Sequence, residues 1–534
     1  MGAGLLSGCG LAIAAGRSDP PAAGSSPPSA SSSSTAPAHS SSTATSASSA
    51  VAPVGSSGSG QPPSSTPALP GLAWTAPPAP WSVGTRVQAA CGFEGVSAPP
   101  AVRFGAGALF LAAERAGVGS SHVCGVAVLS GKRWTVYPLP GGTRLNADAV
   151  LSSGSFVVGT VGVGTDAHAL SYGSGGLFVY TAGRLVPVTI PTGQYVSSLL
   201  ALPGGGYAAG TAPAGSAHPG ASSGRLGVAA AHGGTRWYTP PASGTAKAFG
   251  MAPADPPYGV VVGAVQGNLL WFGVDGVGVA ALNTATGHFQ LHGSTYFPTA
   301  YGPIQFFPNV TSSSTVYYSI HRLPGIADAG YWGPLYAASA AGGGRVRRIF
   351  PATLPGSTPK RPDYGCIQGG VGAPSQVRQY GSRLWVKWSG CQVYEAIQGA
   401  PGLQRPAITC GQTGVWQVDV VFAPGASVSE LCETRGAYVL YTLNGRTGAV
   451  EATHVWKTAP WKTAKGRGIP WAGWFAAPGG GLWAWSSKLY EVAPTGVITA
   501  HYAFAGPLGA VLGARHLWLV GTHGVAAVPA TAAP

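Results

Sequence analysis

One short phrase recurs along most of this chain: two or three Gly or Ser residues, then an aromatic and aliphatic strand, then a turn of small residues. Successive copies lie mostly about 35 to 65 residues apart, which is the spacing of propeller blades with variable loops. Because a four-stranded sheet cannot bury both faces alone, such units must stack on one another. The copies are 107–111, 154–158, 206–209, 267–271, 382–386, 481–485 and 516–520.

The residues between these copies also have the pattern of β-strands. Short apolar runs rich in Val, Tyr, Trp, Phe and Leu alternate with Gly, Pro, Asn and Ser, and no helical periodicity extends over a helix length. Residues 72–530 give seven to nine blades at about 50 to 65 residues each. We therefore predict an all-β fold, a single β-propeller of seven or eight four-stranded blades within 71–534. Residues 74–88 are expected to complete the final blade, which would pair an otherwise open strand edge.

A second phrase, L-N-x-x-T-G, occurs at 282–287 and 443–448. An Asn that caps a turn, followed by a Gly that accepts positive φ, predicts a tight hairpin between adjacent strands. Segment 479–522 resembles the tandem repeat of virginiamycin B lyase-type propellers, and the L-N-x-x-T-G phrase is similar to the hairpin of quinoprotein-like blades. This resemblance implies propeller topology. The catalytic His and Glu of the lyase family have no matching segment here.

The amino-terminal segment indicates where in the cell the protein is located. Leu6-Ser7-Gly8-Cys9 resembles the lipobox of bacterial lipoproteins, in which the cysteine is lipidated, although no basic n-region precedes it. Cleavage after Ala14, giving a freely secreted chain, and a chance cysteine are the alternatives. We interpret 1–16 as a truncated signal and lipobox segment. In 17–70, 47 of 54 residues are Ser, Pro, Ala, Gly or Thr, which predicts a disordered tether.

If Cys9 carries lipid, six of the seven cysteines remain, and an even number in an exported protein predicts three disulfides. Pairing of sequence neighbours is the simplest arrangement, although 15 connectivities exist for six cysteines. No CxxC pair occurs and no His lies at ligand spacing, so neither a metal site nor a cofactor is expected. The pairs are Cys91–Cys124, Cys366–Cys391 and Cys410–Cys432.

The chain is basic because carboxylates are scarce: 29 Lys and Arg stand against 15 Asp and Glu. The cations are scattered, and the densest run is Arg345, Arg347 and Arg348, so nucleic acid is not an expected partner. Few carboxylates predict tolerance of acid, since their protonation is a main cause of acid unfolding. A net positive charge also suits an anionic cell wall or lipid surface.

No catalytic motif stands out. P-loop and H-E-x-x-H patterns are absent from the sequence, and only Glu430 and Glu433 are close carboxylate neighbours. His288 with His292, and Asp166 with His168, are explained as surface or loop residues. A candidate ligand surface is the segment around Trp456, in which aromatic faces alternate with cations suited to sugars or anionic polymers. Burial of these tryptophans between blades is the competing interpretation. The candidate residues are Trp456, Trp461, Lys462, Lys465, Arg467 and Trp471.

Together these features predict a lipid-anchored protein on the extracellular face of the cell membrane. We expect it to act as a binding or scaffold module for a cell-envelope polymer, peptide or protein. An extracellular lyase, hydrolase or quinoprotein-like dehydrogenase with its site in the central funnel is the alternative, because propellers host many functions.

Overall fold

The computed structural model describes residues from Gly71 to Pro529, with gaps. Residues 1–70, which include Cys9 and the predicted tether, lie outside the described residues. The described ranges are 71–92, 102–105, 107–115, 123–162, 173–214, 224–231, 233–240, 259–274, 278–291, 304–307, 315–320, 335–339, 346–350, 374–388, 393–397, 416–423, 426–433, 437–457, 473–477, 481–485, 488–503, 509–512, 516–522 and 524–529.

Within these ranges the strands form nine antiparallel sheets, which we number as blades 1 to 9 along the chain. Blade 1 comprises β1 (Trp81–Ser82), β2 (Val102–Gly105), β3 (Ala108–Arg115), β4 (Val123–Ser130) and β5 (Arg133–Pro138). Blade 2 comprises β6 (Thr143–Val150), β7 (Phe156–Gly162), β8 (Leu177–Thr181) and β9 (Arg184–Val188). Blade 3 comprises β10 (Gln194–Ala201), β11 (Tyr207–Pro213), β12 (Leu226–Ala229) and β13 (Thr235–Tyr238).

Blade 4 comprises β14 (Val260–Gln266), β15 (Leu269–Val274), β16 (Gly278–Asn283) and β17 (Phe289–Leu291). Blade 5 comprises β18 (Ile304–Phe306), β19 (Thr315–Ile320), β20 (Leu335–Ser339) and β21 (Val346–Phe350). Blade 6 comprises β22 (Pro374–Tyr380), β23 (Arg383–Trp388) and β24 (Val393–Ile397). Blade 7 comprises β25 (Trp416–Ala423), β26 (Ser427–Glu433), β27 (Tyr438–Asn444) and β28 (Val450–Trp456). Blade 8 comprises β29 (Gly473–Ala476), β30 (Leu482–Trp485), β31 (Lys488–Val492) and β32 (Ile498–Ala503). Blade 9 comprises β33 (Gly509–Leu512), β34 (His516–Val520) and β35 (Val525–Pro529).

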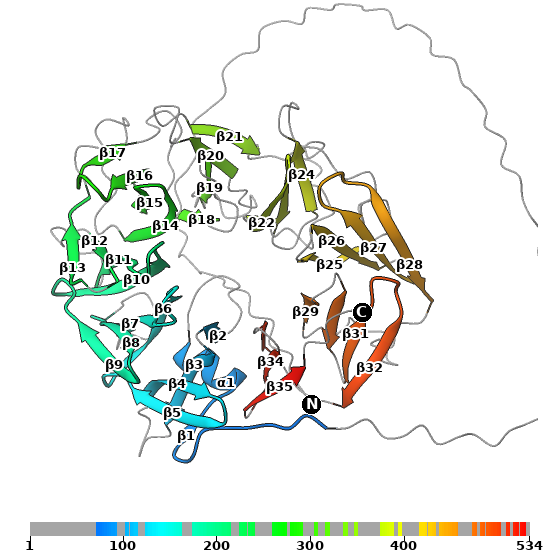
Figure 1. Ribbon diagram of the computed structural model, residues 1–534, viewed down its shortest axis with the longest axis horizontal. Helices are drawn as coiled ribbons and strands as arrows, with labels where there is room; N and C mark the ends of the chain where they lie inside the picture. The colour runs from blue at the N-terminus through cyan, green and yellow to red at the C-terminus, as the bar shows by residue number, and fades with distance from the viewer. Residues whose placement is uncertain are drawn as a thin grey trace, which may run out of the picture. The chain divides into compact units, whose positions relative to one another are not determined.

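The aromatic residue of the recurring phrase lies at the centre of the core. Trp271, Trp385 and Trp483 are each at most 2% exposed. Each packs with residues of a neighbouring blade: Trp271 with blade 5, Trp385 with blade 7 and Trp483 with blade 9. The predicted stacking of incomplete units is confirmed, because each of these sheets buries its aromatic side chain against the next sheet. Figure 1 shows the order in which the sheets follow one another.

The amino-terminal segment closes the series of blades, as predicted. Thr75 forms an antiparallel bridge with Val525 of β35, through two backbone hydrogen bonds of 2.8 and 2.9 Å. Leu72 packs against the cluster that contains Leu517 and Val528. The chain then reaches blade 1, where β1 pairs with β3 (Figure 1). Residues before blade 1 therefore supply the outer edge of blade 9 and join the last blade to the first.

Two details differ from the sequence-based expectation. The described sheets number nine, which is the upper end of the seven to nine that the length allowed and more than the seven or eight that we predicted. Some blades are shorter than the 50 to 65 residues that we assumed, and the strands of blade 8, for example, span only 473–503. A helix, α1 (Thr85–Cys91), also precedes β2. Its seven residues make two turns, which is too short for helical periodicity to be detected.

Both L-N-x-x-T-G phrases form the predicted hairpins. The side-chain Oδ1 of Asn283 accepts from the backbone N–H of residues 285 and 286, and Asn444 does the same with residues 446 and 447. Gly287 and Gly448 follow with φ of 75° and 72°. The cap and the positive φ are thus provided by the two residue types that the sequence pattern identified.

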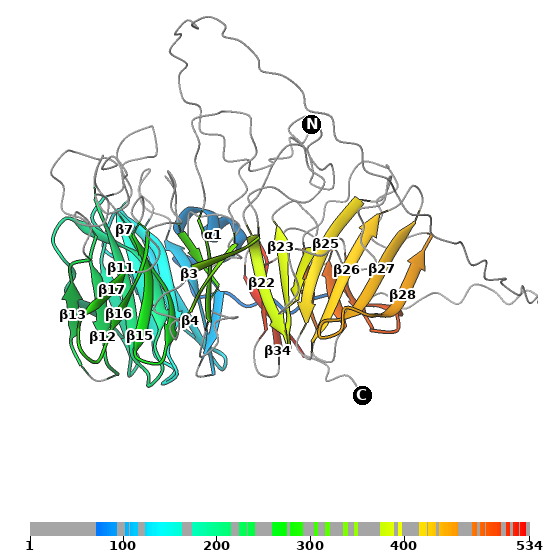
Figure 2. The same ribbon diagram turned by 90° about the horizontal axis from the view of Figure 1, so that it is seen from above.

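The two ends of the sheets are unlike. Within each blade, leaving β1 aside, the first strand is joined to the second at one end of the sheet, and the third strand is joined to the fourth at that same end wherever a fourth strand is described. We call this end the hairpin face, and 131–132, 182–183 and 445–449 are examples of its hairpins. Second-to-third and blade-to-blade connections join strand ends at the opposite end, which we call the connection face. Several are long, including 239–259, 351–373 and 457–472. Figure 2 shows α1 at the connection face and the hairpins at the other.

Candidate functional site

The connection face is the candidate site because most of the sequence outside regular strands joins strand ends there. Loops on a rigid scaffold carry binding residues more often than the scaffold does. Short hairpins leave little chain at the opposite end. The long connection that follows β28 also contains most of the predicted aromatic and basic surface: Trp461, Lys462, Lys465, Arg467 and Trp471, which lie outside the described residues.

Trp456, the remaining residue of that predicted surface, is described. It is the last residue of β28, is half-buried and packs against the cluster shared by blades 7 and 8. Its ring also stacks on His454, with centroids 6.3 Å apart. His454 in turn contacts the carbonyl oxygen of Pro494 at 3.1 Å through Nε2. At Trp456 the structure therefore favours packing between blades, the competing interpretation of the sequence.

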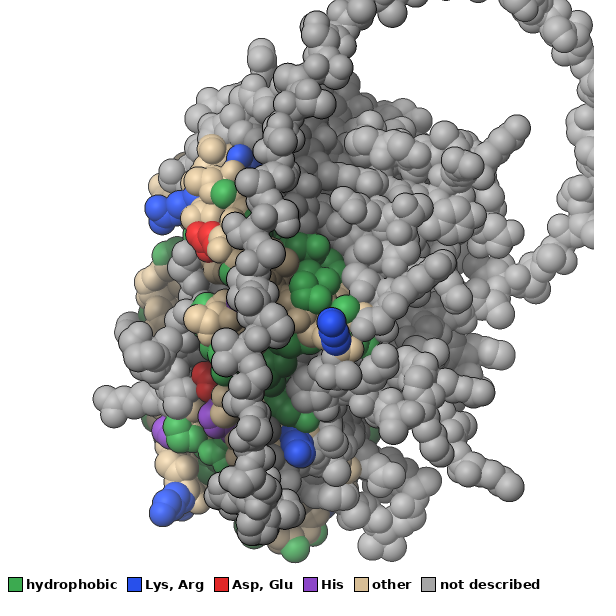
Figure 3. Space-filling view, turned by 90° about the vertical axis from the view of Figure 1, so that its right-hand side faces the viewer, with side chains coloured by type: hydrophobic (Ala, Val, Ile, Leu, Met, Phe, Trp, Pro, Cys, Tyr) green, Lys and Arg blue, Asp and Glu red, His purple; other side chains and the backbone are tan. Residues whose placement is uncertain are grey.

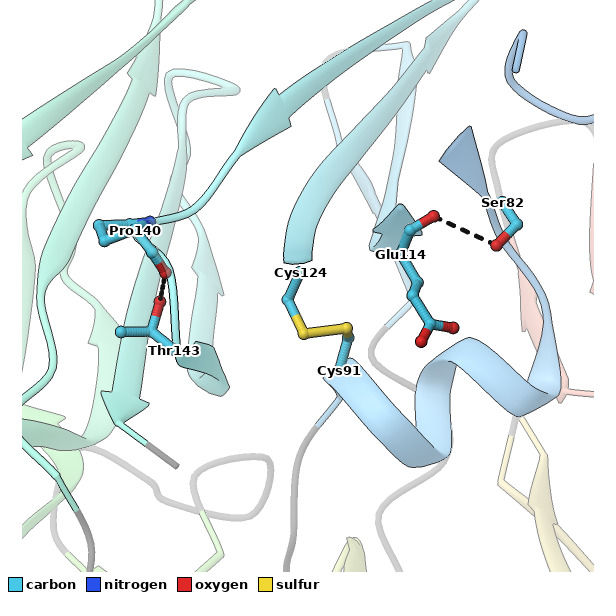
Figure 4. The surroundings of a disulfide bond; sticks show 6 residues. All are labelled: Ser82, Cys91, Glu114, Cys124, Pro140 and Thr143. Atoms are coloured by element: carbon cyan, nitrogen blue, oxygen red, sulfur yellow. Dashed lines mark hydrogen bonds between the residues drawn. A yellow bond between two sulfur atoms is a disulfide. The ribbon is translucent and has the colours of Figure 1, made fainter. Parts of the chain in front are cut away.

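A disulfide stabilises the connection face beside α1. Cys91 is the last residue of α1 and is bonded to Cys124 near the start of β4, as predicted (Figure 4). Nearby, Ser82 donates its hydroxyl to the carbonyl oxygen of Glu114 at 3.2 Å. These contacts hold β1 and α1 against blade 1 at the connection face, where β3 ends.

A second covalent link involves Cys432, which is fully buried near the end of β26 and is disulfide-bonded. Its partner lies outside the described residues, so the predicted bond with Cys410 stays a prediction. Cys366 and Cys391 also lie outside the described residues, and their pairing stays a prediction. Cys124 and Cys432 both occupy strand ends at the connection face, so disulfides hold that face in two separate blades.

The first strands of blades 2 and 3 carry polar side chains that bridge to the next blade. Each strand contains a register shift, at Leu145/Ala147 and at Val196/Ser198. At the first, Asn146 donates Nδ2 to the carbonyl oxygen of Val196 at 2.6 Å. At the second, the Ser197 hydroxyl donates to the carbonyl oxygen of Val260 at 2.5 Å. The extra residue of each bulge therefore holds neighbouring blades together rather than presenting a free polar group.

One charged pair also joins two blades and was not predicted. Arg103 on β2 contacts Asp148 on β6, with Nε to Oδ2 at 2.8 Å and Nη2 to Oδ1 at 3.3 Å. The Asp148 side chain is 5% exposed and that of Arg103 is 41% exposed. Burial raises the pKa of Asp148, and the neighbouring Arg103 only partly opposes this. The two residues are 45 positions apart in sequence, so no local pattern indicates the pair.

The raised pKa of Asp148 predicts a pH dependence of stability. Because the folded-state pKa lies above the unfolded one, the destabilising contribution is full at pH values above the folded pKa. It fades as pH falls through that value and is lost below the unfolded pKa. Relative to Asp148→Asn, the native chain is therefore expected to gain thermal stability as pH falls from neutral towards about 4. Melting curves of both chains across this range test the trend, and a constant difference would contradict it. Glu451→Gln, at an exposed carboxylate, serves as control.

The carboxylates and histidines considered as catalytic do not converge in the described part of the chain. Glu430 is fully buried within blade 7, and Glu433 ends the same strand, β26. His288 is exposed in the hairpin before β17, at the hairpin face. His292, Asp166 and His168 lie outside the described residues. His501 and Glu491, 2.8 Å apart, pair across β31 and β32 of blade 8.

No group of three or more His, Cys, Asp or Glu side chains in the described ranges is arranged to hold a metal ion. Within those same ranges α1 is the only helix, and its length is far below that of a membrane-crossing helix.

Nine sequential antiparallel sheets that bury their aromatic residues against one another define a β-propeller. No family model matches the chain, and no curated protein matches its sequence. Among solved structures it is similar to BamB from Moraxella catarrhalis, at 10% identity and a TM-score of 0.36, over 77% of this chain and 94% of that chain. It is also similar to the Dos1 propeller, at 13% identity and a TM-score of 0.36, over 71% and 90%.

Proposed function

We propose that this protein is a lipid-anchored, extracellular binding module whose connection face holds a cell-envelope polymer, peptide or protein. The observation that carries the proposal is the division between the two ends of the sheets. Long connections join strand ends at one face, and the disulfides of Cys91 and Cys432 stabilise strands of that face. Covalent constraint of this kind lowers the entropy lost when loops bind a partner.

The anchor in this proposal is Cys9, followed by the tether 17–70. A spacer of Ser, Pro, Ala, Gly and Thr gives a folded module reach from a lipid without adding structure of its own. Within the connection face, Trp461 and Trp471 are proposed to stack on the ligand, and Lys462, Lys465 and Arg467 to attract anionic groups on it. No metal and no cofactor is part of the proposal.

The test joins localisation and binding. The full chain is expected in the membrane fraction of cells, and the Cys9→Ser chain in the soluble extracellular fraction. That soluble chain is then sedimented with isolated cell-wall sacculi. Trp461→Ala with Trp471→Ala is expected to weaken co-sedimentation by about 5-fold to 150-fold, because each aromatic contact contributes about 0.5–1.5 kcal/mol.

Val186→Ala is the control, since Val186 is 43% exposed on β9, away from this segment. Equal loss in the control and the tryptophan variant would contradict a role of the connection face. A Cys9→Ser chain that remained in the membrane fraction would contradict the anchor alone.

A further inference from the structure

The hairpin face carries exposed cations with few carboxylates. The side chains of Lys132, Arg133, Arg184, Arg236 and Arg446 are exposed in or directly after its hairpins, on blades 1, 2, 3 and 7. We call these five residues the basic hairpin surface. In sequence, none of the hairpins 131–132, 182–183, 230–234, 284–288, 381–382, 445–449 and 493–497 contains Asp or Glu.

The carboxylates nearest to these hairpins already have partners within the protein. Asp148 is paired with Arg103, and Glu491 with His501. Glu451, which is exposed, accepts a hydrogen bond from Asn444 Nδ2 at 2.8 Å. By contrast, no member of the basic hairpin surface forms an ion pair with another described residue. Among the described residues of these hairpins and the strand positions next to them, five exposed cations against one exposed carboxylate, Glu451, leave an excess of positive charge.

The direction of the closing segment is a second, independent observation. β35 runs from Val525 to Pro529 and ends at the hairpin face. Because Thr75 pairs antiparallel with Val525, the residues before Thr75 run towards that same face. Leu72 packs against a cluster that includes Leu517 and Val528, which lie at the hairpin ends of β34 and β35. Gly71, where the described part of the chain begins, therefore lies towards the hairpin face.

We propose that the hairpin face rests on the anionic headgroups of a lipid bilayer. The hairpins that carry or precede these cations, 131–132, 182–183, 230–234 and 445–449, are two to five residues long, so cations on blades 1, 2, 3 and 7 can meet a flat surface together. Figure 3 views the propeller from its side, where the Lys and Arg side chains in colour lie as separate spots. Each Lys or Arg near an anionic leaflet strengthens binding about fivefold.

This orientation is not contained in the proposed function, because it assigns a ligand to the opposite face. It directs the connection face away from the membrane, towards the surroundings. It also places the attachment of the preceding chain on the membrane side, so that a lipidated residue reaches the bilayer without passing around the propeller.

The test uses the full chain carrying Cys9→Ser, so that no attached lipid contributes to binding. The vesicles are phosphatidylcholine with or without about a third phosphatidylglycerol, so that only their anionic charge differs. Sedimentation is expected with anionic vesicles only and is expected to disappear at high salt, since exposed charges are screened. The variant Lys132→Gln with Arg184→Gln and Arg446→Gln is expected to bind about 100-fold more weakly, from three fivefold contributions.

The matched control is Arg115→Gln with Lys457→Gln and Lys488→Gln, which removes three exposed cations at or near the connection face. It is expected to bind anionic vesicles as the parent chain does, with both variants showing the parent melting curve. Equal weakening by the two triple variants, or binding to neutral vesicles, would overturn the proposal. So would binding to long-chain polyphosphate without binding to anionic vesicles. Sedimentation with sacculi is a separate readout, so each proposal fails independently.

Discussion

Replacing both Cys91 and Cys124 with serine is expected to lower the free energy of unfolding by about 3–4 kcal/mol. The bond closes a loop with a sequence separation of 33 residues, and loop closure of about that length in the unfolded chain accounts for this value. If unfolding is cooperative over the propeller, the melting temperature falls by about 3–4 °C, because the entropy of unfolding grows with chain length.

The position of this disulfide adds a local effect. Cys91 ends α1, which follows the segment that bridges blades 9 and 1 through Thr75. Without the bond, only noncovalent contacts hold α1, such as the hydrogen bond from Thr85 N to the carbonyl oxygen of Gly521 at 3.0 Å. Limited proteolysis is therefore expected to cleave within 76–92 before it cleaves any blade.

The measurement is a melting curve and a proteolysis time course of the double variant, with the bond of Cys432 retained. Native chain treated with reductant is the comparison, and it is expected to melt at or below the variant, since it loses every disulfide. A variant with the native melting temperature and native protease resistance would show that α1 is held without the bond.

Trp385→Ala is expected to destabilise the fold by about 3–5 kcal/mol, the range for removal of a buried tryptophan. Trp385 is fully buried in blade 6 and packs with Val420, Val428 and Leu443 of blade 7. Its Nε1 donates to the carbonyl oxygen of Gly445 at 2.6 Å. The substitution leaves both a cavity between two blades and an unpaired buried carbonyl.

Trp385→Phe separates these two contributions. Most of the apolar ring remains, while the donor to Gly445 is lost, so a loss of about 1–3 kcal/mol is expected. Trp237→Ala is the control, because Trp237 on β13 is only half-buried and donates to the carbonyl oxygen of Thr189 at the surface. Chemical denaturation of the three variants gives the comparison. A loss for Trp385→Ala no larger than for Trp237→Ala would show that the interface between blades 6 and 7 contributes little.

The propeller and its hairpins were predictable because their signals are local. Strand alternation, the recurring aromatic residue and the two L-N-x-x-T-G turns each depend on a few neighbouring residues, and Trp271, Asn283 and Gly448 lie where those patterns predicted. Cys91–Cys124 was found by pairing sequence neighbours. The exact number of blades was less accessible, because blade length varies and several blades share no clear phrase.

The candidate site was only partly accessible from sequence. The aromatic and basic segment after β28 was identified by composition, but the role of Trp456 depended on a cluster formed with residues from blade 8. The ion pair of Arg103 with Asp148 and the bridges from Asn146 and Ser197 join different blades, so no local spacing indicates them.

By itself, the sequence determined the β-strand character of the chain, the repeating unit and the turns, because these follow from backbone preferences and from the burial of short apolar runs. Tertiary structure decided which strand ends share a face. Whether a residue lies at the hairpin face or at the connection face depends on how many strands precede it in its blade. Lys132, Arg184 and Arg446 are scattered in sequence, and only the stacking of nine antiparallel sheets brings them to one end of the molecule.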